Sequence, residues 1–139
     1  MKSRHILLIA LGIAIAAGQS GNKAIAVNLA TANWSHEKGS AEGSEGAIVH
    51  VDQGTGGMDL LVRFPAGHVI APHFHDSNER IFVAEGQLTL HQDTGDALLN
   101  AGGFAFLPAH EIQRLSCTSK TRCTFYLSWD GKPDSHPAN

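Results

Sequence analysis

The sequence predicts an all-β fold, a barrel or a sandwich built from short strands. Short apolar runs alternate with turn residues at close intervals, and no stretch of useful length repeats its apolar residues with the period of a helix. The 15 glycines among 139 residues are suited to the many tight turns of such a fold. With 42% hydrophobic and 17% charged residues, a chain of this length forms one domain around one core.

Nine segments are expected to be strands. The first follows a glycine- and serine-rich stretch, and the others are apolar runs of four to seven residues. In chain order they are Ala47–Val51, Met58–Phe64, Ile70–His75, Arg80–Ala84, Gln87–His91, Ala97–Asn100, Phe104–Leu107, Glu111–Cys117 and Cys123–Trp129. Turn signals separate most of them, among them Pro65-Ala66-Gly67, Asp76-Ser77-Asn78, Glu85-Gly86, Asp93-Thr94-Gly95 and Ala101-Gly102-Gly103.

The first 26 residues resemble an export signal. A short basic start is followed by an apolar run, Ile6–Ala17, which is too short to span a bilayer comfortably. Ala24-Ile25-Ala26 is the better cleavage signal, and a cut after Ala17 or Gly18 is the alternative. The segment is therefore expected to direct the protein to the periplasm or outside the cell. An uncleaved membrane anchor or a buried N-terminal strand is the competing interpretation.

The charge balance excludes several kinds of partner. The whole chain has a formal charge of −3 and a pI of about 6.3, without the basic excess of a nucleic-acid-binding domain. Removal of residues 1–26 leaves seven basic and thirteen acidic residues. A mature protein this acidic is not expected to associate stably with an anionic membrane.

The mature chain divides into three parts. Residues 27–56 are expected to form a flexible N-terminal arm with one edge strand, because glycine, serine and glutamate dominate them. Residues 57–130 carry the apolar runs and are expected to form the barrel. Residues 131–139 are polar and contain proline, and are expected to be a frayed tail.

Cys117 and Cys123 are expected to form a disulfide. They enclose five polar residues between two strand-like runs, which predicts a hairpin with one cysteine at each shoulder. In an oxidising compartment such a pair is bridged rather than free. Two small buried thiols are the alternative, and a metal role is weaker because the spacing is not that of a C-x-x-C pair.

His73, His75 and Glu79 are the candidate metal ligands. Side chains two apart on a strand point to the same face, so the two imidazoles converge while Phe74 points away. An Asp-Ser-Asn turn follows, and a reversal there returns Glu79 to the same place. Two neutral imidazoles and one carboxylate match a facial triad for a divalent first-row metal. The alternative to a metal site is a pair of surface histidines near an acidic residue, without a ligand.

These residues resemble the first motif of the cupins. Gly67, His73, His75, Glu79 and Gly86 occupy its fixed positions, and the resemblance covers about residues 57–129. It implies a double-stranded β-helix, a small jelly-roll barrel with its site inside. The segment from Phe104 to Trp129 is also similar, more weakly, to small bacterial proteins related to the cupin domain of zinc-binding anti-sigma factors.

The second cupin motif is only partly met. Gly102 and Pro108 are present, but His110 replaces the next glycine, and Gln113 stands where the family has a further histidine. The resemblance implies Gln113 as the fourth ligand or a close neighbour of the metal. An amide oxygen is a weaker ligand than imidazole and suits harder metals. His110 is the competitor, and a three-ligand site completed by water is the third option.

The expected function is that of an exported metal-binding cupin acting on a small molecule. One divalent ion (iron, manganese, nickel or zinc) would support dioxygenase-, isomerase- or lyase-type chemistry. The alternative is a non-catalytic module that binds or senses a metal and a small ligand, and a metal-free barrel is the weakest interpretation. Catalytic residues are not assigned, and a homodimer would cover an exposed sheet edge. The positions expected to point inward are all apolar, which argues against an elaborate acid–base mechanism: Ile81, Val83, Leu88, Leu90, Phe104 and Phe106.

Overall fold

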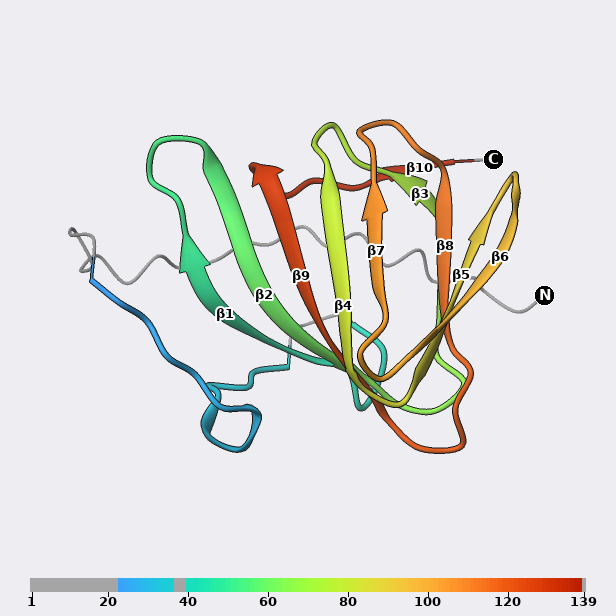
Figure 1. Cartoon of the computed structure of the whole chain (residues 1–139), viewed down its shortest axis with the longest axis horizontal. Helices are drawn as coiled ribbons and strands as arrows, with labels where there is room; N and C mark the ends of the chain where they lie inside the picture. Colours follow the sequence, from blue (N-terminus) through green and yellow to red (C-terminus); the bar gives the residue numbers. More distant parts are fainter. Residues whose placement is uncertain (1–22, 37–39, 139) are drawn as a thin grey trace.

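A computed structural model describes residues 23–36 and 40–138 and contains ten strands (Figure 1). They are β1 (Glu45–Val51), β2 (Gly56–Phe64), β3 (Val69–Phe74), β4 (Glu79–Glu85), β5 (Gln87–Gln92), β6 (Gly95–Asn100), β7 (Phe104–Leu107), β8 (Gln113–Cys117), β9 (Cys123–Gly131) and β10 (His136–Pro137). All nine predicted strands are present, with bounds that differ by at most two residues at either end. The structure adds β10 and one short 3-10 helix, Leu29–Thr31.

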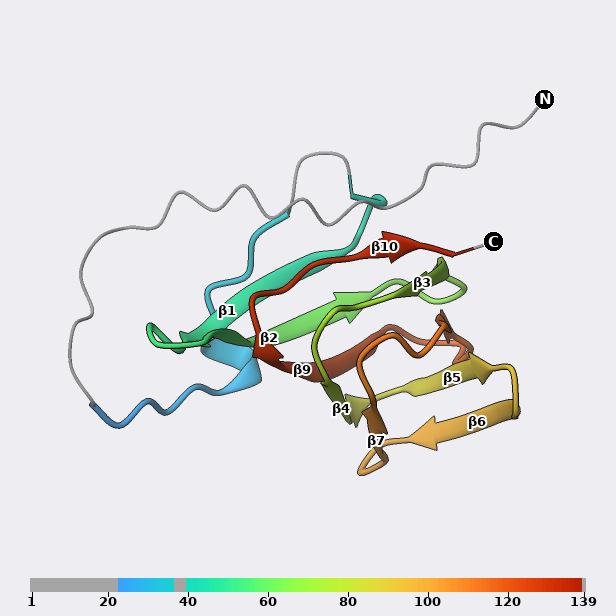
Figure 2. The same ribbon diagram turned by 90° about the horizontal axis from the view of Figure 1, so that it is seen from above.

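The strands form two antiparallel sheets that face each other (Figures 1 and 2). One has the order β1-β2-β9-β4-β7 and the other the order β10-β3-β8-β5-β6. Apart from the consecutive pairs β1–β2 and β5–β6, neighbouring strands in each sheet are distant in sequence, because the chain passes from one sheet to the other at several turns. This arrangement is the predicted double-stranded β-helix, and the fold class is confirmed.

The hydrophobic core lies between the two sheets. Alternate residues of the central strands point inward, so that each strand contributes its apolar face. The large apolar side chains that lose all or nearly all contact with solvent come from four strands: Ile81 and Val83, Leu88, Leu107, and Phe125. Burying such side chains is the main favourable term in folding.

Phe104 and Phe106 point outward, which corrects the prediction that they line the barrel. Their side chains are 59% and 48% exposed. In the pairing of β4 with β7, Glu79 lies opposite Leu107 and Ile81 opposite Ala105. Leu107 and Ala105 therefore share the inner face with these residues, and the two phenylalanines fall on the outer one. The sequence predicts that alternate residues of β7 share a face, but the register of β7 with β4 determines which of the two faces is inside.

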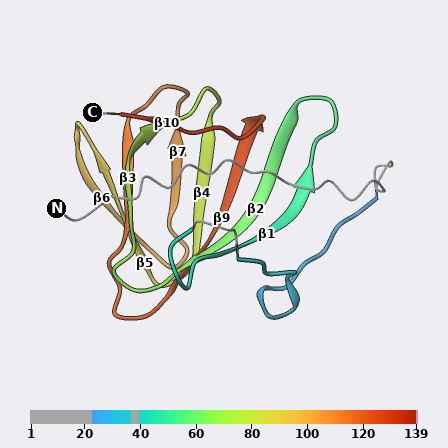
Figure 3. The same ribbon diagram turned by 180° about the vertical axis from the view of Figure 1, so that it is seen from behind.

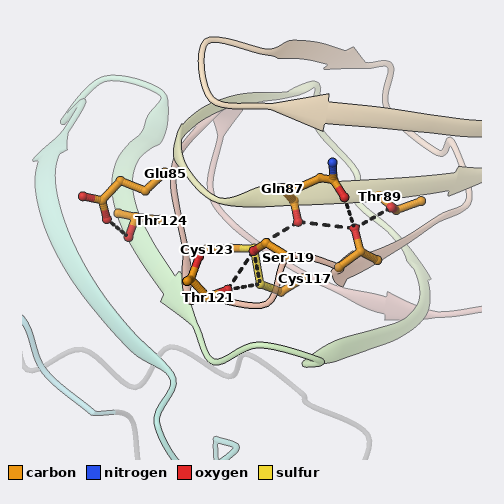
Figure 4. The surroundings of a disulfide bond; sticks show 9 residues. Glu85, Gln87, Thr89, Cys117, Ser119, Thr121, Cys123 and Thr124 are labelled. Carbon is orange, nitrogen blue, oxygen red and sulfur yellow. Dashed lines mark hydrogen bonds between the residues drawn. A yellow bond between two sulfur atoms is a disulfide. The ribbon is translucent and has the colours of Figure 1, made fainter.

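The predicted disulfide is present, but it does not close a hairpin. Cys117 ends β8 in one sheet and Cys123 begins β9 in the other, with their Cα atoms 5.8 Å apart. Figure 4 shows the bridge at the turn between the sheets, where the Ser119 hydroxyl donates to the Thr121 carbonyl at 2.7 Å. The cross-link therefore joins the two sheets at one end of the barrel. A polar loop between two strand-like runs has the same sequence pattern whether it closes a hairpin or connects strands of different sheets.

The segment predicted as an N-terminal arm contributes β1, an edge strand paired with β2. Before it, Ser35 and Gly46 exchange backbone hydrogen bonds of 2.9 Å. The Arg63 guanidinium lies over the Trp34 ring at 3.7 Å from its centroid, a cation–π contact. These contacts attach part of the arm to the outer face of the first sheet.

Most of the predicted export signal, residues 1–22, lies outside the described residues. Within the described part of the chain, no helix has the length and apolar character needed to cross a membrane.

The polar tail pairs with a strand at residues 136 and 137, contrary to the prediction that it is frayed. His136 and Pro137 form β10 and pair with Phe74 and His73 of β3. The His136 ring stacks on the Phe74 ring at 5.0 Å. Figures 2 and 3 both show the tail running beside β3. Its order depends on pairing with a strand about sixty residues earlier, which polar composition does not reveal.

Candidate metal centre

His73 and His75 lie side by side near one end of the barrel interior. Both come from β3 or its end, and both are buried, with 8% and 4% of their surface exposed. Their ring centroids are 4.9 Å apart and the rings are nearly perpendicular. Phe74, between them in sequence, instead contacts the rings of His110 and His136. The period of two along the strand therefore separates an inner pair of histidines from an outer aromatic contact.

Backbone carbonyls orient both imidazoles. Nδ1 of His73 is 2.8 Å from the Ala71 carbonyl oxygen, and Nδ1 of His75 is 2.5 Å from that of Asp134. A carbonyl only accepts, so each Nδ1 carries the hydrogen and each neutral ring has its lone pair on Nε2. Such a bond to the far nitrogen is the usual support of a metal-bound histidine.

Glu79 and Gln113 adjoin the histidine pair from two other strands. Glu79 begins β4 and Gln113 begins β8, and they are 2% and 1% exposed. Gln113 lies opposite His73 in the sheet, and its Nε2 donates a hydrogen bond to Oε2 of Glu79. Oε2 of Glu79 is also 3.4 Å from Nε2 of His75. Residues from β3, β4 and β8 thus form one buried polar group inside an apolar barrel.

Two atoms of this group have no hydrogen-bond partner among the described residues. They are Nε2 of His75 and Oε1 of Gln113, and both are buried. Leaving a buried lone pair unsatisfied costs about 1–3 kcal/mol. A divalent ion would satisfy both, and two imidazoles, a carboxylate and an amide oxygen are a donor set that first-row metals accept. The residues therefore fit such an ion.

The two histidines differ in their tendency to take up a proton. Burial lowers the pKa of His73, which keeps its ring neutral. Burial has the same effect on His75, but the nearby Glu79 carboxylate, helped by Asp134, favours the charged ring, outweighs burial and raises the pKa of His75. His75 is therefore the histidine from which an incoming cation would displace a proton.

His110, the competing fourth ligand, lies outside the barrel. Its side chain is 67% exposed, and its backbone has a positive φ of 67°. Its Nδ1 is 3.6 Å from Oδ1 of Asp76 on the surface. The structure thus brings together His73, His75, Glu79 and Gln113, and places His110 elsewhere.

The inner group is more open than a closed metal site. One group of three histidine, cysteine or acidic side chains in the described part of the chain has ligand atoms that all lie within 4.8 Å of one another. This group is not the inner group and lies on the surface. It comprises Asp76, Asp134 and His136. The acidic and imidazole atoms of the inner group are farther apart than this in at least one pair.

Sequence reasoning missed two residues at the centre. Asp134 accepts the hydrogen bond from His75 through its main chain, 59 positions along the sequence. Trp129 lies opposite Glu79 in the sheet, its ring is 5.8 Å from that of His75, and its buried Nε1 has no partner among the described residues. No spacing rule connects Asp134 with the motif. For Trp129, the inward phase of β9 is the signal that points to it.

Known proteins resemble the chain in both sequence and fold. The family model of the ChrR cupin-like domain matches residues 22–130. No curated protein matches the sequence. Among solved structures, the polyketide cyclase RemF from Streptomyces resistomycificus is similar, with 19% identity, a TM-score of 0.66, and coverage of 84% of this chain and 87% of RemF.

Two further structures share the fold. KdgF from Halomonas sp. is 18% identical with a TM-score of 0.64, covering 78% of this chain and 94% of KdgF. The complex of Rhodobacter sphaeroides SigE with the anti-sigma factor ChrR is also similar, at 18% identity and a TM-score of 0.58. There the match covers 74% of this chain and 52% of the other. At these identities the structural likeness establishes the fold alone.

Proposed function

The chain belongs to the family of ChrR cupin-like domains, and from this premise we propose that it binds one divalent first-row metal ion inside its barrel and acts on a small molecule there. The proposed ligands are His73, His75, Glu79 and Gln113. The observation that carries the proposal is a pair of buried atoms that make no hydrogen bond within the described part of the chain, Nε2 of His75 and Oε1 of Gln113, beside the Glu79 carboxylate. Iron, manganese, nickel and zinc all suit this donor set.

Each proposed ligand has a separate role. His73 and His75 offer Nε2 because backbone carbonyls accept from their Nδ1 atoms. Glu79 supplies a negative charge, and Gln113 holds that carboxylate with its amide nitrogen while its oxygen faces the same group. When bound, the ion would supply a Lewis acid for a carbonyl or enol, or at iron a centre for dioxygen.

The surroundings favour simple chemistry at the ion. The walls that β4 and β7 contribute next to Glu79 are apolar and buried: Ile81 lies two positions along β4, and Leu107 lies opposite Glu79. They exclude water and offer no further acid or base to a substrate. Lyase-, isomerase- or dioxygenase-type reactions that take place on a metal-held substrate are compatible with such walls. Trp129 adds one neutral donor near the group.

A non-catalytic sensing role is the second candidate. The family match supports it, since the family takes its name from ChrR, the anti-sigma factor in the similar complex with SigE. The apolar walls support it equally, because binding a metal and a ligand needs no proton transfer. Turnover of a bound small molecule separates the two candidates.

Metal content across four variants tests the proposed centre. His75→Ala should lose most of the ion bound inside the barrel, because it deletes an imidazole donor. Gln113→Ala should weaken binding much less, since water can replace an amide oxygen, and Gln113→His should retain or raise affinity for zinc or nickel. His110→Ala is the matched control and should leave the inner ion in place.

The measurement is elemental analysis at one pH, because protons compete with the ion for its ligands. If His75→Ala retained the full amount of metal inside the barrel, the proposed location of the metal centre would be wrong. Loss in His110→Ala but not in Gln113→Ala would reassign the fourth ligand. Elemental analysis of protein from its native compartment also identifies the ion and so narrows the reaction class.

We also propose that the protein is exported to the periplasm or beyond. The disulfide between Cys117 and Cys123 supports this, since such bonds persist in oxidising compartments. Cell fractionation with N-terminal sequencing of the mature protein is the test. A full-length chain in the cytoplasm with two free thiols would contradict it.

A further inference from the structure

A second group of metal-type ligands lies on the outer side of β3, behind the histidine pair. Nε2 of His136 is 3.1 Å from Oδ2 of Asp76 and 3.4 Å from Oδ2 of Asp134. All three ligand atoms lie within 4.8 Å of one another, a closer arrangement than that of the inner acidic and imidazole groups. We refer to Asp76, Asp134 and His136 as the outer triad. His110 borders it, with Nδ1 3.6 Å from Asp76.

The fold holds the outer triad in place before any ligand arrives. Asp76 follows His75 directly, and its backbone N–H donates to Oδ1 of Asp134 at 3.0 Å. His136 is held by its pairing with Phe74 and by stacking on that ring. The Ala138 N–H donates to the Pro72 carbonyl at 3.0 Å and secures the end of the tail. Three residues from two distant segments are thus positioned by contacts that do not use the atoms facing one another.

The two carboxylates of the outer triad favour binding of a cation. Within the described part of the chain, the ion-pair partners of Asp76 and Asp134 are imidazoles only, from His75, His110 and His136. No lysine or arginine among those residues lies within ion-pair distance of either carboxylate. Elsewhere on the described surface, the carboxylates of Glu45 and Asp130 are each paired with an arginine, and those of Asp59 and Asp96 are each paired with a single histidine.

The histidine of the triad places one ring nitrogen between the two carboxylates. Nε2 of His136 is buried and has no hydrogen-bond partner among the described residues, although two carboxylates flank it. An unpartnered imidazole nitrogen between two carboxylate oxygens is an arrangement that a borderline divalent ion would complete. Imidazole and carboxylate together suit zinc better than calcium or magnesium, which prefer oxygen alone.

We propose that the outer triad is a second divalent-metal site, of the zinc type, bound through Asp76, Asp134 and His136. It lies outside the barrel, shares no ligand with the inner centre, and goes beyond the function proposed above. One residue connects the two sites. Asp134 offers its side chain to the outer ion and its main-chain carbonyl to Nδ1 of His75. An ion held outside would therefore also hold the group that orients an inner ligand.

Zinc stoichiometry of the full chain tests the proposal, measured by titration at one fixed pH. The wild-type protein should take up two equivalents. Asp76→Asn and His136→Gln should each lose one of them at zinc concentrations that saturate the wild type. His73→Gln, which alters the inner centre without touching the outer triad, should retain the outer equivalent.

His50→Gln is the matched control. His50 is an exposed histidine whose Nδ1 is 3.2 Å from the Asp59 carboxylate, and among the described residues Asp59 is its one ion-pair partner. This variant should still bind two equivalents. The proposal is overturned if His50→Gln loses one equivalent, or if Asp76→Asn and His136→Gln retain two. It is also overturned if the wild-type protein binds only one equivalent of zinc and His73→Gln abolishes that binding.

Amide hydrogen exchange provides a readout independent of stoichiometry. The second equivalent of zinc should slow exchange at Ala138, whose N–H donates to Pro72, in the wild-type protein but not in Asp76→Asn. Unchanged exchange in the wild type would contradict a site in the tail. If His73→Gln binds one equivalent of zinc fewer than the wild type and retains the outer equivalent, both proposals are supported. If His73→Gln still binds two equivalents, the proposed inner centre is refuted and the outer site is unaffected.

Discussion

The amide of Gln113 donates a hydrogen bond to the carboxylate of Glu79, and both side chains are almost completely buried. The two residues begin different strands in different sheets, 34 positions apart. A buried carboxylate without donors is costly, so this amide stabilises the ionised acid in the metal-free protein. The same contact directs one carboxylate oxygen toward His75.

Replacement of Gln113 by methionine should destabilise the metal-free protein by about 1–3 kcal/mol, because a charged acceptor loses its donor. Urea unfolding in the presence of a chelator measures the change. The Glu79→Gln, Gln113→Met double variant completes a thermodynamic cycle, and a coupling energy should appear because the residues are in contact. Purely additive effects would show that the hydrogen bond contributes nothing.

The metal-free protein should show opposite pH dependences at its two inner histidines. Burial lowers the pKa of His73, so the folded state binds fewer protons there than the unfolded state. That residue costs stability as pH falls through about 6.5, the ordinary value. The raised pKa of His75 has the reverse effect, despite its burial, because Glu79 favours the charged ring. Its contribution is present below the ordinary value and is lost as pH rises through the folded-state pKa.

Urea unfolding against pH, with chelator present, measures these slopes. His73→Asn should lose less stability than the wild type on acidification. His75→Asn should lack the stability that the wild type gains on the acid side. Nuclear magnetic resonance of the ring protons checks the order directly, and a His75 that titrates below His73 would contradict the assignment.

The cross-link between the sheets should stabilise the barrel modestly. Because it closes a loop of only six positions, its removal in the Cys117→Ala, Cys123→Ala variant should cost about 2–3 kcal/mol at most. Thermal unfolding measures the loss. Intact mass with and without reductant should differ by two hydrogens, and two alkylatable thiols in the unreduced native protein would contradict the bond.

Two motif glycines should differ in their tolerance of alanine. Both Gly67 and Gly86 have φ of +81°, so a side chain at either position strains the backbone. At Gly86 an added Cβ would also lie 2.8 Å from the Arg122 carbonyl oxygen, whereas at Gly67 no described residue beyond the two chain neighbours comes within 4 Å of it. Gly67→Ala should therefore cost about 1–2 kcal/mol, and Gly86→Ala more by about 1–3 kcal/mol. Equal losses in urea unfolding would mean that the close approach has no effect.

The outward-facing aromatic residues should contribute little to stability. Phe104→Ala should cost less than about 1 kcal/mol, because the ring is more than half exposed, whereas Phe125→Ala should cost about 3–5 kcal/mol. Urea unfolding compares the two. Sedimentation of the Phe104 variant and the wild type also tests the predicted homodimer, since a large loss of assembly or of stability would show that this face is covered in solution.

The local parts of the fold and the candidate centre could be predicted from the sequence. The turn residues and apolar runs locate nine strands, and β7 has the predicted bounds. The period of two places His73 and His75 together, and a three-residue turn brings Glu79 back to them. These inferences span at most about a dozen residues, within which strand geometry and turn chemistry alone determine the arrangement.

Contacts between distant strands were decided by the tertiary structure. Alternation along β7 could not show that Phe104 faces solvent, because its phase follows the register with β4. The two cysteine strands lie in different sheets for a similar reason, since the next strand in sequence need not be the neighbour in space. The meeting of Gln113 with Glu79, and of Asp134 with His75, depends on how the sheets close on each other. A strand's own sequence determines which of its residues share a face, whereas the packing of the whole chain determines which face is inside and what lies opposite.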